Sequence, residues 1–274
     1  MSRISQTFAA CRAAGRTALI PYITGGDPDP QQLVALMHAL VDGGADLIEI
    51  GVPFSDPMAD GPVIQAACAR ALAAGTTPAK LCEAVARFRE RDEATPVVFM
   101  GYANSLEAAG YETYVERAAS AGVDGLLTVD LPPEEAGSLP DLAAQHGIEL
   151  IYLVAPNTTA ARLQKISAVA GGFIYAVALK GVTGSANLDT TLLADQVAAI
   201  RRVSQLPVAV GFGVRDAASA GAVAQVADAV VVGSALVQLI GEHGEATDLP
   251  ERLRAAVAEL RRGIDEKAAM EVRS

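Results

Sequence analysis

The stretch GGADLIEIGVPFSDPMADGP, residues 43–62, shows how this chain is built. Two glycines end a helical segment, the apolar run Leu47–Ile50 follows, and a long loop stiffened by prolines comes next. A short apolar run bounded by turn residues is typical of a parallel strand that is covered on both faces. Similar entries into a strand recur at Gly122–Leu126 and Val226–Val230, each with an aspartate before the apolar run. Their unequal spacing excludes a solenoid of fixed period.

Eight such runs alternate with longer segments of helical period. The runs are Ala18–Ile23, Leu47–Ile50, Pro96–Met100, Gly125–Val129, Ile148–Val154, Phe173–Ala178, Pro207–Val210 and Ala229–Val232. Alternating strands and helices with right-handed crossovers predict an α/β fold, a (β/α)8 or TIM barrel. An open doubly wound sheet is the alternative, but it would have fewer strands and a glycine fingerprint after the first one. We expect a single domain over residues 1–274.

Helix start signals support this interpretation. Asp29-Pro30 and Thr77-Pro78 each place a capping side chain before a proline, which predicts a helix start at both positions. An extra helix is expected over Ser2–Ala14, before the first strand. Another short helix is expected after Gly233, directly behind the eighth strand.

Composition excludes several classes of protein. The 274 residues carry a net charge of −11 and only 4% aromatic residues, which argues against nucleic-acid binding. The sequence contains no apolar run long enough for a membrane span and no apolar secretory core near its start. The three cysteines lie far apart, so we expect neither a disulfide framework nor a zinc site. A reducing cytoplasm fits this pattern.

Glu49 is the most informative residue of the chain. It lies inside an apolar strand, and no basic residue occurs in that strand or in the sequence after it up to Arg70. A carboxylate in such a place is costly unless it is paired or used, and burial raises its pKa toward the range of a working acid or base. A structural ion pair from elsewhere in the chain is the alternative.

The loop after Glu49 offers a second carboxylate. Loops at the carboxyl ends of barrel strands form the active-site face, so Asp56 and Asp60 are candidates. Both could instead serve only as turn residues in Asp-Pro and Asp-Gly. The three histidines are placed on helices away from the strand ends, and we predict no histidine triad and no metal site.

Glycines near the end of the chain indicate a phosphate site. The seventh strand leads into Gly211-Phe212-Gly213, and the eighth leads into Gly233-Ser234 at a helix start. Glycine lets backbone N–H groups approach an oxyanion, and a helix N-terminus favours negative charge. The glycine-bearing loop 179–187 after the sixth strand is a candidate lid. Tyr175, in that strand, is core-like when taken alone.

One long motif, residues 48–62, closely resembles the tryptophan synthase α subunit family. Further matches extend over roughly residues 3 to 265. They are Ile23–Pro28, Tyr102–Asn104, Asp130–Glu135, Gly181–Gly184, Gly211–Gly213 and Gly233–Ala235. The resemblance implies a barrel that cleaves indole-3-glycerol phosphate to indole and glyceraldehyde 3-phosphate, with no metal or organic cofactor in this chain.

The resemblance also implies roles for individual residues. Glu49 would be the general acid and base, Asp60 would face the indole N–H, and Tyr175 would lie near the reacting centre. The phosphate would be bound by Gly184, Gly213, Gly233 and Ser234. The substrate pocket would be lined by Tyr22, Leu127, Thr183 and Phe212.

The same resemblance implies a partner, a β subunit that carries pyridoxal phosphate, in an α2β2 assembly. It would dock near Pro53–Met58, Tyr102–Leu106 and Leu131–Pro133. We therefore expect Phe54, Met58, Leu106 and Leu131 to be exposed together. Two alternatives share the motifs: a free-standing indole-3-glycerol phosphate lyase, and a non-catalytic phosphate-binding subunit that activates its partner.

Overall fold

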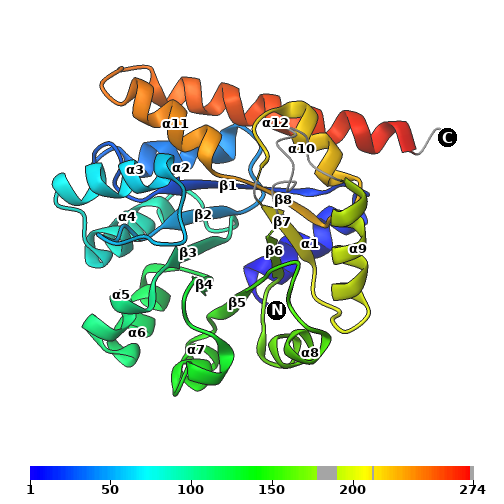
Figure 1. The fold of residues 1–274 in the computed structure, drawn as a ribbon. Coiled ribbons are helices and arrows are strands. Elements are labelled where there is room, and N and C mark those ends of the chain that lie inside the picture. Colours follow the sequence, from blue (N-terminus) through cyan, green and yellow to red (C-terminus); the bar gives the residue numbers. More distant parts are fainter. Residues whose placement is uncertain (178–189, 212, 272–274) are drawn as a thin grey trace.

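Eight parallel strands close into a barrel, and helices surround it (Figure 1). The computed structural model describes residues 1–177, 190–211 and 213–271. The strands are β1 Ala18–Thr24, β2 Ile48–Gly51, β3 Val97–Gly101, β4 Gly125–Thr128, β5 Glu149–Val154, β6 Ile174–Val177, β7 Val208–Gly211 and β8 Ala229–Val232. Each pairs in parallel with its neighbour, and β1 pairs with β8, so the predicted barrel is confirmed and the open sheet is wrong.

The helices alternate with the strands as predicted. They are α1 Arg3–Ala13, α2 Leu33–Asp42, α3 Pro62–Ala73, α4 Pro78–Arg89, α5 Ala103–Ala109, α6 Tyr111–Ala121, α7 Leu139–His146, α8 Ala160–Val169, α9 Thr190–Arg201, α10 Ala217–Ala224, α11 Ser234–His243 and α12 Leu249–Glu271, with a short 3-10 helix at Pro133–Glu135. None of the helices in the described residues is long and apolar enough to cross a membrane.

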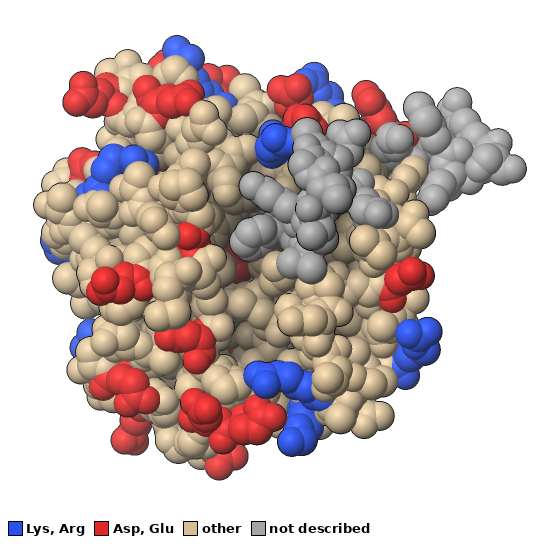
Figure 2. Space-filling view, in the orientation of Figure 1, with Lys and Arg blue, Asp and Glu red and all other residues tan. Residues whose placement is uncertain are grey.

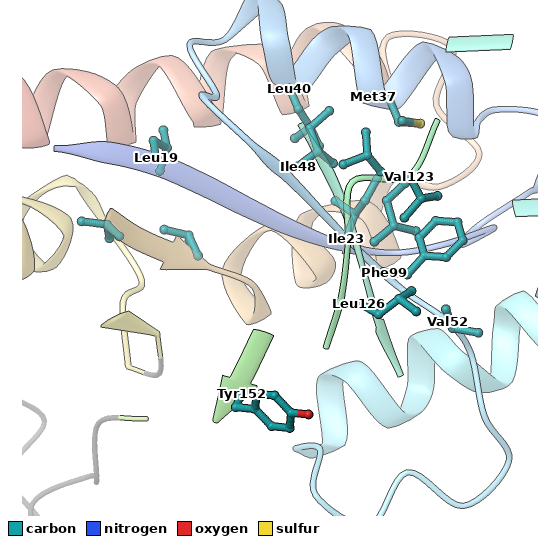
Figure 3. Packing of buried hydrophobic residues seen from close by; sticks show 14 of the residues in the cluster. Leu19, Ile23, Met37, Leu40, Ile48, Val52, Phe99, Val123, Leu126 and Tyr152 are labelled. Carbon is teal, nitrogen blue, oxygen red and sulfur yellow. The ribbon is translucent and has the colours of Figure 1, made fainter. Parts of the chain in front are cut away.

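The main hydrophobic core lies between the sheet and the helices. Side chains from the outer face of the strands, such as Ile23, Ile48 and Phe99, pack against Met37 and Leu40 of α2 (Figure 3). All five are at most 1% exposed. Because both faces of the barrel wall are covered, the strands are mostly apolar on both faces, which is the pattern seen in the sequence.

A second cluster fills the barrel itself. It contains inward side chains of the strands and of the residues just before them, such as Leu127, Leu47 and Phe173, and it is closed at the bottom by α1. Phe8 of that helix contacts Phe173, with ring centroids 5.7 Å apart. The extra N-terminal helix therefore plugs the amino-terminal end of the barrel, and the site must lie at the other end.

One of the two predicted proline helix starts is correct. The Thr77 hydroxyl accepts a hydrogen bond from Lys80 N at 3.3 Å, and α4 begins at Pro78. Asp29-Pro30 does not begin α2, which starts at Leu33 instead. The Asp29 carboxylate accepts from Gln31 N at 2.9 Å and so closes its own turn ahead of the helix.

The recurring aspartate before a strand has a structural role. Asp46, Asp124 and Asp228 each accept the backbone N–H of the preceding strand in the chain, at 2.9, 2.8 and 2.8 Å. Each aspartate also pairs with arginine: Arg16 and Arg261, Arg3 and Arg89, and Arg201, respectively. These three aspartate clamps lock strand pairs β1–β2, β3–β4 and β7–β8 at the amino-terminal end of the barrel.

Candidate active site

Glu49 points into the barrel from the middle of β2. Its register partner on β1 is Tyr22, and its side chain is only 1% exposed. Both carboxylate oxygens lack a hydrogen-bond partner within the part of the chain that the structure describes. Burial raises the pKa of Glu49 from 4.5 to about 8, and the nearby charge of Asp60 adds to the rise. An unpaired carboxyl with such a pKa can exchange protons near neutrality.

The two candidate aspartates of the loop differ in burial: Asp60 is partly buried and its charge acts on Glu49, whereas Asp56 is exposed. The Asp60 side chain is partly buried, and burial raises its pKa above the ordinary value, while a hydrogen bond from Tyr102 opposes that rise. Asp56 is exposed and accepts a hydrogen bond from the Ser55 hydroxyl at 2.7 Å, which fits a turn residue. The loop therefore aims one of its two candidate aspartates at the site.

Tyr102 is a site residue that the sequence reasoning missed. It directly follows β3, and its hydroxyl donates to Asp60 Oδ2 at 2.7 Å and accepts from Ala59 N at 3.1 Å. In the sequence, Tyr102 belongs to a matched family motif and to a predicted docking segment, and nothing there assigns it a role in the site. Its position just past the carboxyl end of a strand was the available signal, because site residues of barrels come from such positions.

Tyr22 and Tyr175 enclose Glu49 on the inner wall of the barrel. Both are buried, and burial raises the pKa of each well above the ordinary value, with the charge of Glu49 contributing. A Cβ at Gly51 would overlap with the Tyr22 hydroxyl, and one at Gly211 would overlap with that of Tyr175. The two glycines therefore make room for two neutral phenols beside the carboxyl group. Leu127 lies in the same interior cluster, below the mouth.

The phosphate site was predicted at the ends of β7 and β8. Gly213 has φ +81°, a conformation that favours glycine, in the loop after β7. Gly233 is the N-cap of α11, and its carbonyl accepts from Leu236 N at 2.9 Å and Val237 N at 3.0 Å. Ser234 is the exposed first residue of that helix. The first N–H groups of a helix have no partner within it, so this end can bind an anion.

Some predicted residues lie outside the described part of the chain. These are Thr183, Gly184 and Phe212, together with the candidate lid 179–187. The predicted roles of these residues stay predictions. Within the described residues, no group of three histidine, cysteine, aspartate or glutamate side chains is arranged to hold a metal ion.

The expected apolar surface of the partner-facing loops is only partly present. Met58 is 84% exposed and Phe54 is partly buried, but Leu106 and Leu131 are only 3% and 9% exposed. The expectation that all four are exposed was wrong, because Leu106 and Leu131 turn inward and join the main core.

Figure 2 shows acidic side chains gathered over α6 and α7 on this view, and a hollow near the centre with red atoms in its wall.

The chain is similar to known proteins over nearly its whole length. Residues 8–268 match the sequence family described as tryptophan synthase alpha chain. The tryptophan synthase alpha chain of Halorhodospira halophila is 74% identical over 97% of both chains. That of Thioalkalivibrio sulfidiphilus is 56% identical and covers 97% of this chain and all of its own.

Solved structures agree with the sequence matches. Tryptophan synthase subunit alpha from Legionella pneumophila superposes with a TM-score of 0.90 at 42% identity, covering 97% of this chain and 99% of its own. A chain of tryptophan synthase from M. tuberculosis, in an aminoacrylate-bound form, gives 0.86 at 38% identity and covers 96% and 100%. With a family match over residues 8–268, and with relatives above half identity along almost all of their length, the chain belongs to the tryptophan synthase alpha chain family.

Proposed function

We propose that this chain is the lyase subunit of a tryptophan synthase. It cleaves indole-3-glycerol phosphate to indole and glyceraldehyde 3-phosphate, and it does so at the barrel mouth around Glu49 and Asp60. The observation that carries the proposal is the Glu49 carboxyl group, which is buried, has both oxygens unpaired within the described residues, and has a pKa of about 8. A group in that state is arranged for proton transfer.

The chemistry assigns a task to each group. The protonated Glu49 donates a proton to C3 of the indole ring, which leaves a positive charge centred on the ring nitrogen. Asp60, as an anion, accepts the indole N–H and stabilises that charge. The hydroxyl of the side chain next to C3 then loses its proton to Glu49. The oxygen of that substrate hydroxyl becomes the aldehyde oxygen, and the bond between C3 and the carbon that carries it breaks. The bonding electrons return to the ring, and Glu49 ends protonated again.

The surrounding residues bind and orient the substrate. Tyr22 and Leu127 line the pocket for the indole ring, and Tyr175 lies next to the carboxyl group that moves the proton. Gly213, Gly233 and Ser234 bind the phosphate at the start of α11. Binding energy from the phosphate lies far from the broken bond, so it can be used to orient the reacting atoms. We further propose that Thr183 and Phe212 line the pocket and that Gly184 binds phosphate.

A direct assay tests this function. The pure chain is mixed with indole-3-glycerol phosphate and indole release is measured. Glu49→Gln keeps the shape of the side chain but cannot carry a proton, so we expect turnover to fall by ~10²–10⁴-fold or more, with binding retained. A variant that keeps more than about a tenth of the wild-type rate would contradict the role of Glu49.

We propose that a β subunit with pyridoxal phosphate docks at Pro53–Met58, Tyr102–Leu106 and Leu131–Pro133, in an α2β2 assembly. A groove of about 440 Å³ between the first two segments, lined by Phe54 and Asn104 among others, supports this location. Docking there would restrain the loop that carries Asp60. Titrating the chain with a β subunit from the same source should therefore raise the indole release rate by ~5–150-fold. A fast chain that is neither bound nor stimulated would favour the free-standing lyase.

Two further points remain proposals. Residues 1–274 act as one domain, which is supported by α1 packing in the barrel floor and α12 packing on α2 and α10. The chain works in the cytoplasm, which is supported by its three free and buried cysteines.

A further inference from the structure

The Tyr102 hydroxyl makes two hydrogen bonds with the loop that carries Asp60, one as donor and one as acceptor. The phenol has one proton, and it donates that proton to Asp60 Oδ2 at 2.7 Å. The oxygen also accepts from Ala59 N at 3.1 Å, one residue before the aspartate. The hydroxyl thus links the loop backbone to the carboxylate. Because its oxygen already accepts the Ala59 N–H, its own proton points to Asp60.

The ring and the backbone of Tyr102 are held as firmly as the hydroxyl. The ring is 3% exposed and packs on Phe54, with centroids 5.3 Å apart. The next residue, Ala103, donates its backbone N–H to Asp130 Oδ1 at 2.7 Å, and Asp130 belongs to the loop after β4. The position of Tyr102 is therefore fixed by its packing on Phe54 and by a backbone hydrogen bond between the segments that follow β3 and β4.

We propose that Tyr102 is a positioning residue, which holds Asp60 in the orientation and the anionic state that it needs to accept the indole N–H. The proposal rests on the proposed function and adds a residue to it. Tyr102 does not touch reacting atoms in this account; it acts through Asp60. A hydrogen bond to a charged acceptor is shorter and stronger than one between neutral groups, which suits this task.

The proton state of Asp60 depends on every group around it. Glu49 of β2, Tyr22 of β1, Tyr175 of β6 and Cys68 of α3 all interact electrostatically with it. These groups are neutral or acidic, so none of them stabilises the anion by opposite charge. Among the residues that the structure describes, the Tyr102 hydroxyl is the neighbour that lowers the pKa of Asp60. Its removal must raise that pKa further.

The variant Tyr102→Phe tests the proposal, because it keeps the ring on Phe54 and removes only the hydroxyl. We expect kcat/KM to fall ~10–100-fold at neutral pH, the usual loss for a hydrogen bond to a charged group. The acid limb of the pH profile should also move to higher pH. Tyr152→Phe is the matched control: it removes a hydroxyl from a buried tyrosine on the outer face of β5, and both rate and profile should stay unchanged.

A double-mutant cycle with Asp60→Asn separates positioning from packing. If Tyr102 acts through Asp60, then Tyr102→Phe should have little further effect in the Asp60→Asn background. Independent, additive losses together with an unmoved acid limb would overturn the proposal.

A readout without catalysis distinguishes this inference from the proposed function. Carbon NMR of the Asp60 carboxyl can follow its titration in a Glu49→Gln background, which removes the coupled carboxyl group. Tyr102→Phe should raise the pKa of Asp60 there, and an unchanged value overturns the inference. If the wild-type chain releases no indole while this NMR shift is present, the proposed function fails and the positioning contact stands.

Discussion

Replacing Glu49 with glutamine should inactivate the protein and should also remove a loss of stability that the wild type suffers as pH rises. The buried carboxyl has a pKa of about 8 in the folded chain and an ordinary value of 4.5. Below pH 4.5 the group is protonated in the folded and the unfolded state, so it does not affect folding. As pH rises toward 8, the unfolded chain loses the proton while the folded chain keeps it, and this difference lowers the stability of the wild type.

The size of the effect follows from the two pKa values. Each pH unit between them corresponds to ~1.4 kcal/mol, so the penalty in the wild type reaches about 3 kcal/mol at pH 7 and levels off at about 5 kcal/mol above pH 8. Glutamine stays neutral at every pH and avoids this loss. Any cost of burying its amide is the same at every pH. The prediction is therefore the pH dependence of the difference between the two proteins.

Urea unfolding followed by circular dichroism measures this difference, and the absence of tryptophan makes fluorescence a poorer probe. The stability of Glu49→Gln relative to the wild type should be lowest at about pH 4.5 and should grow steadily to about pH 8. The exposed Glu116→Gln on α6 is the control, and its stability should differ from the wild type by a constant amount. A Glu49→Gln difference that stays flat across this range would refute the claim that the carboxyl group is held protonated.

Three further predictions concern other parts of the barrel. Indole release should decline as pH rises above about 8, because Glu49 then loses the proton that it donates; a profile that stays flat well beyond that pH contradicts this role. Ser234→Asp should weaken binding of glycerol phosphate by ~10-fold or more in calorimetry, since its charge repels the phosphate at the start of α11. Ala160→Asp adds the same charge at the start of α8 and should not change that affinity. Asp124→Asn should lower the unfolding free energy by about 3 kcal/mol, measured in urea, with kcat/KM unchanged, because it breaks a buried ion pair far from the site.

Local patterns in the sequence were enough for most of the fold. The strands are short, mostly apolar and bounded by turns, so each can be recognised from its own few residues. The observed bounds agree with the predicted runs within a residue or two. Glu49 was predictable for the same reason, because a single carboxylate in an apolar strand is a local contradiction. The helix start predicted at Asp29 was wrong because an aspartate before a proline can either cap a helix or close its own turn. The sequence signal is the same in both cases.

The features that were missed depend on contacts between distant segments. Tyr102 and Asp60 lie 42 residues apart, and their hydrogen bond exists only because the loops after β2 and β3 meet at the barrel mouth. Leu106 and Leu131 were expected outside because their segments were taken as solvent-facing loops, whereas Leu106 lies on α5. Only the folded structure shows that both side chains turn back into the core. The aspartate before the strands was noticed, but its partners are arginines of other segments, as far away as Arg261 for Asp46.

The aspartate clamps have a consequence for how this barrel could change over generations. One of them also fastens the two ends of the chain, since Arg261 of α12 bonds both Asp46 at 3.2 Å and the carbonyl oxygen of Thr17, just before β1, at 3.0 Å. The two ends of the chain are therefore joined at the floor of the barrel, by residues that lie far from Glu49 and Asp60. The loops at the rim can be exchanged, lengthened or redesigned without opening the ring. A library that randomises rim loops while keeping Asp46, Asp124 and Asp228 should retain a high fraction of folded members, and this makes the scaffold a suitable starting point for selecting new lyase substrates.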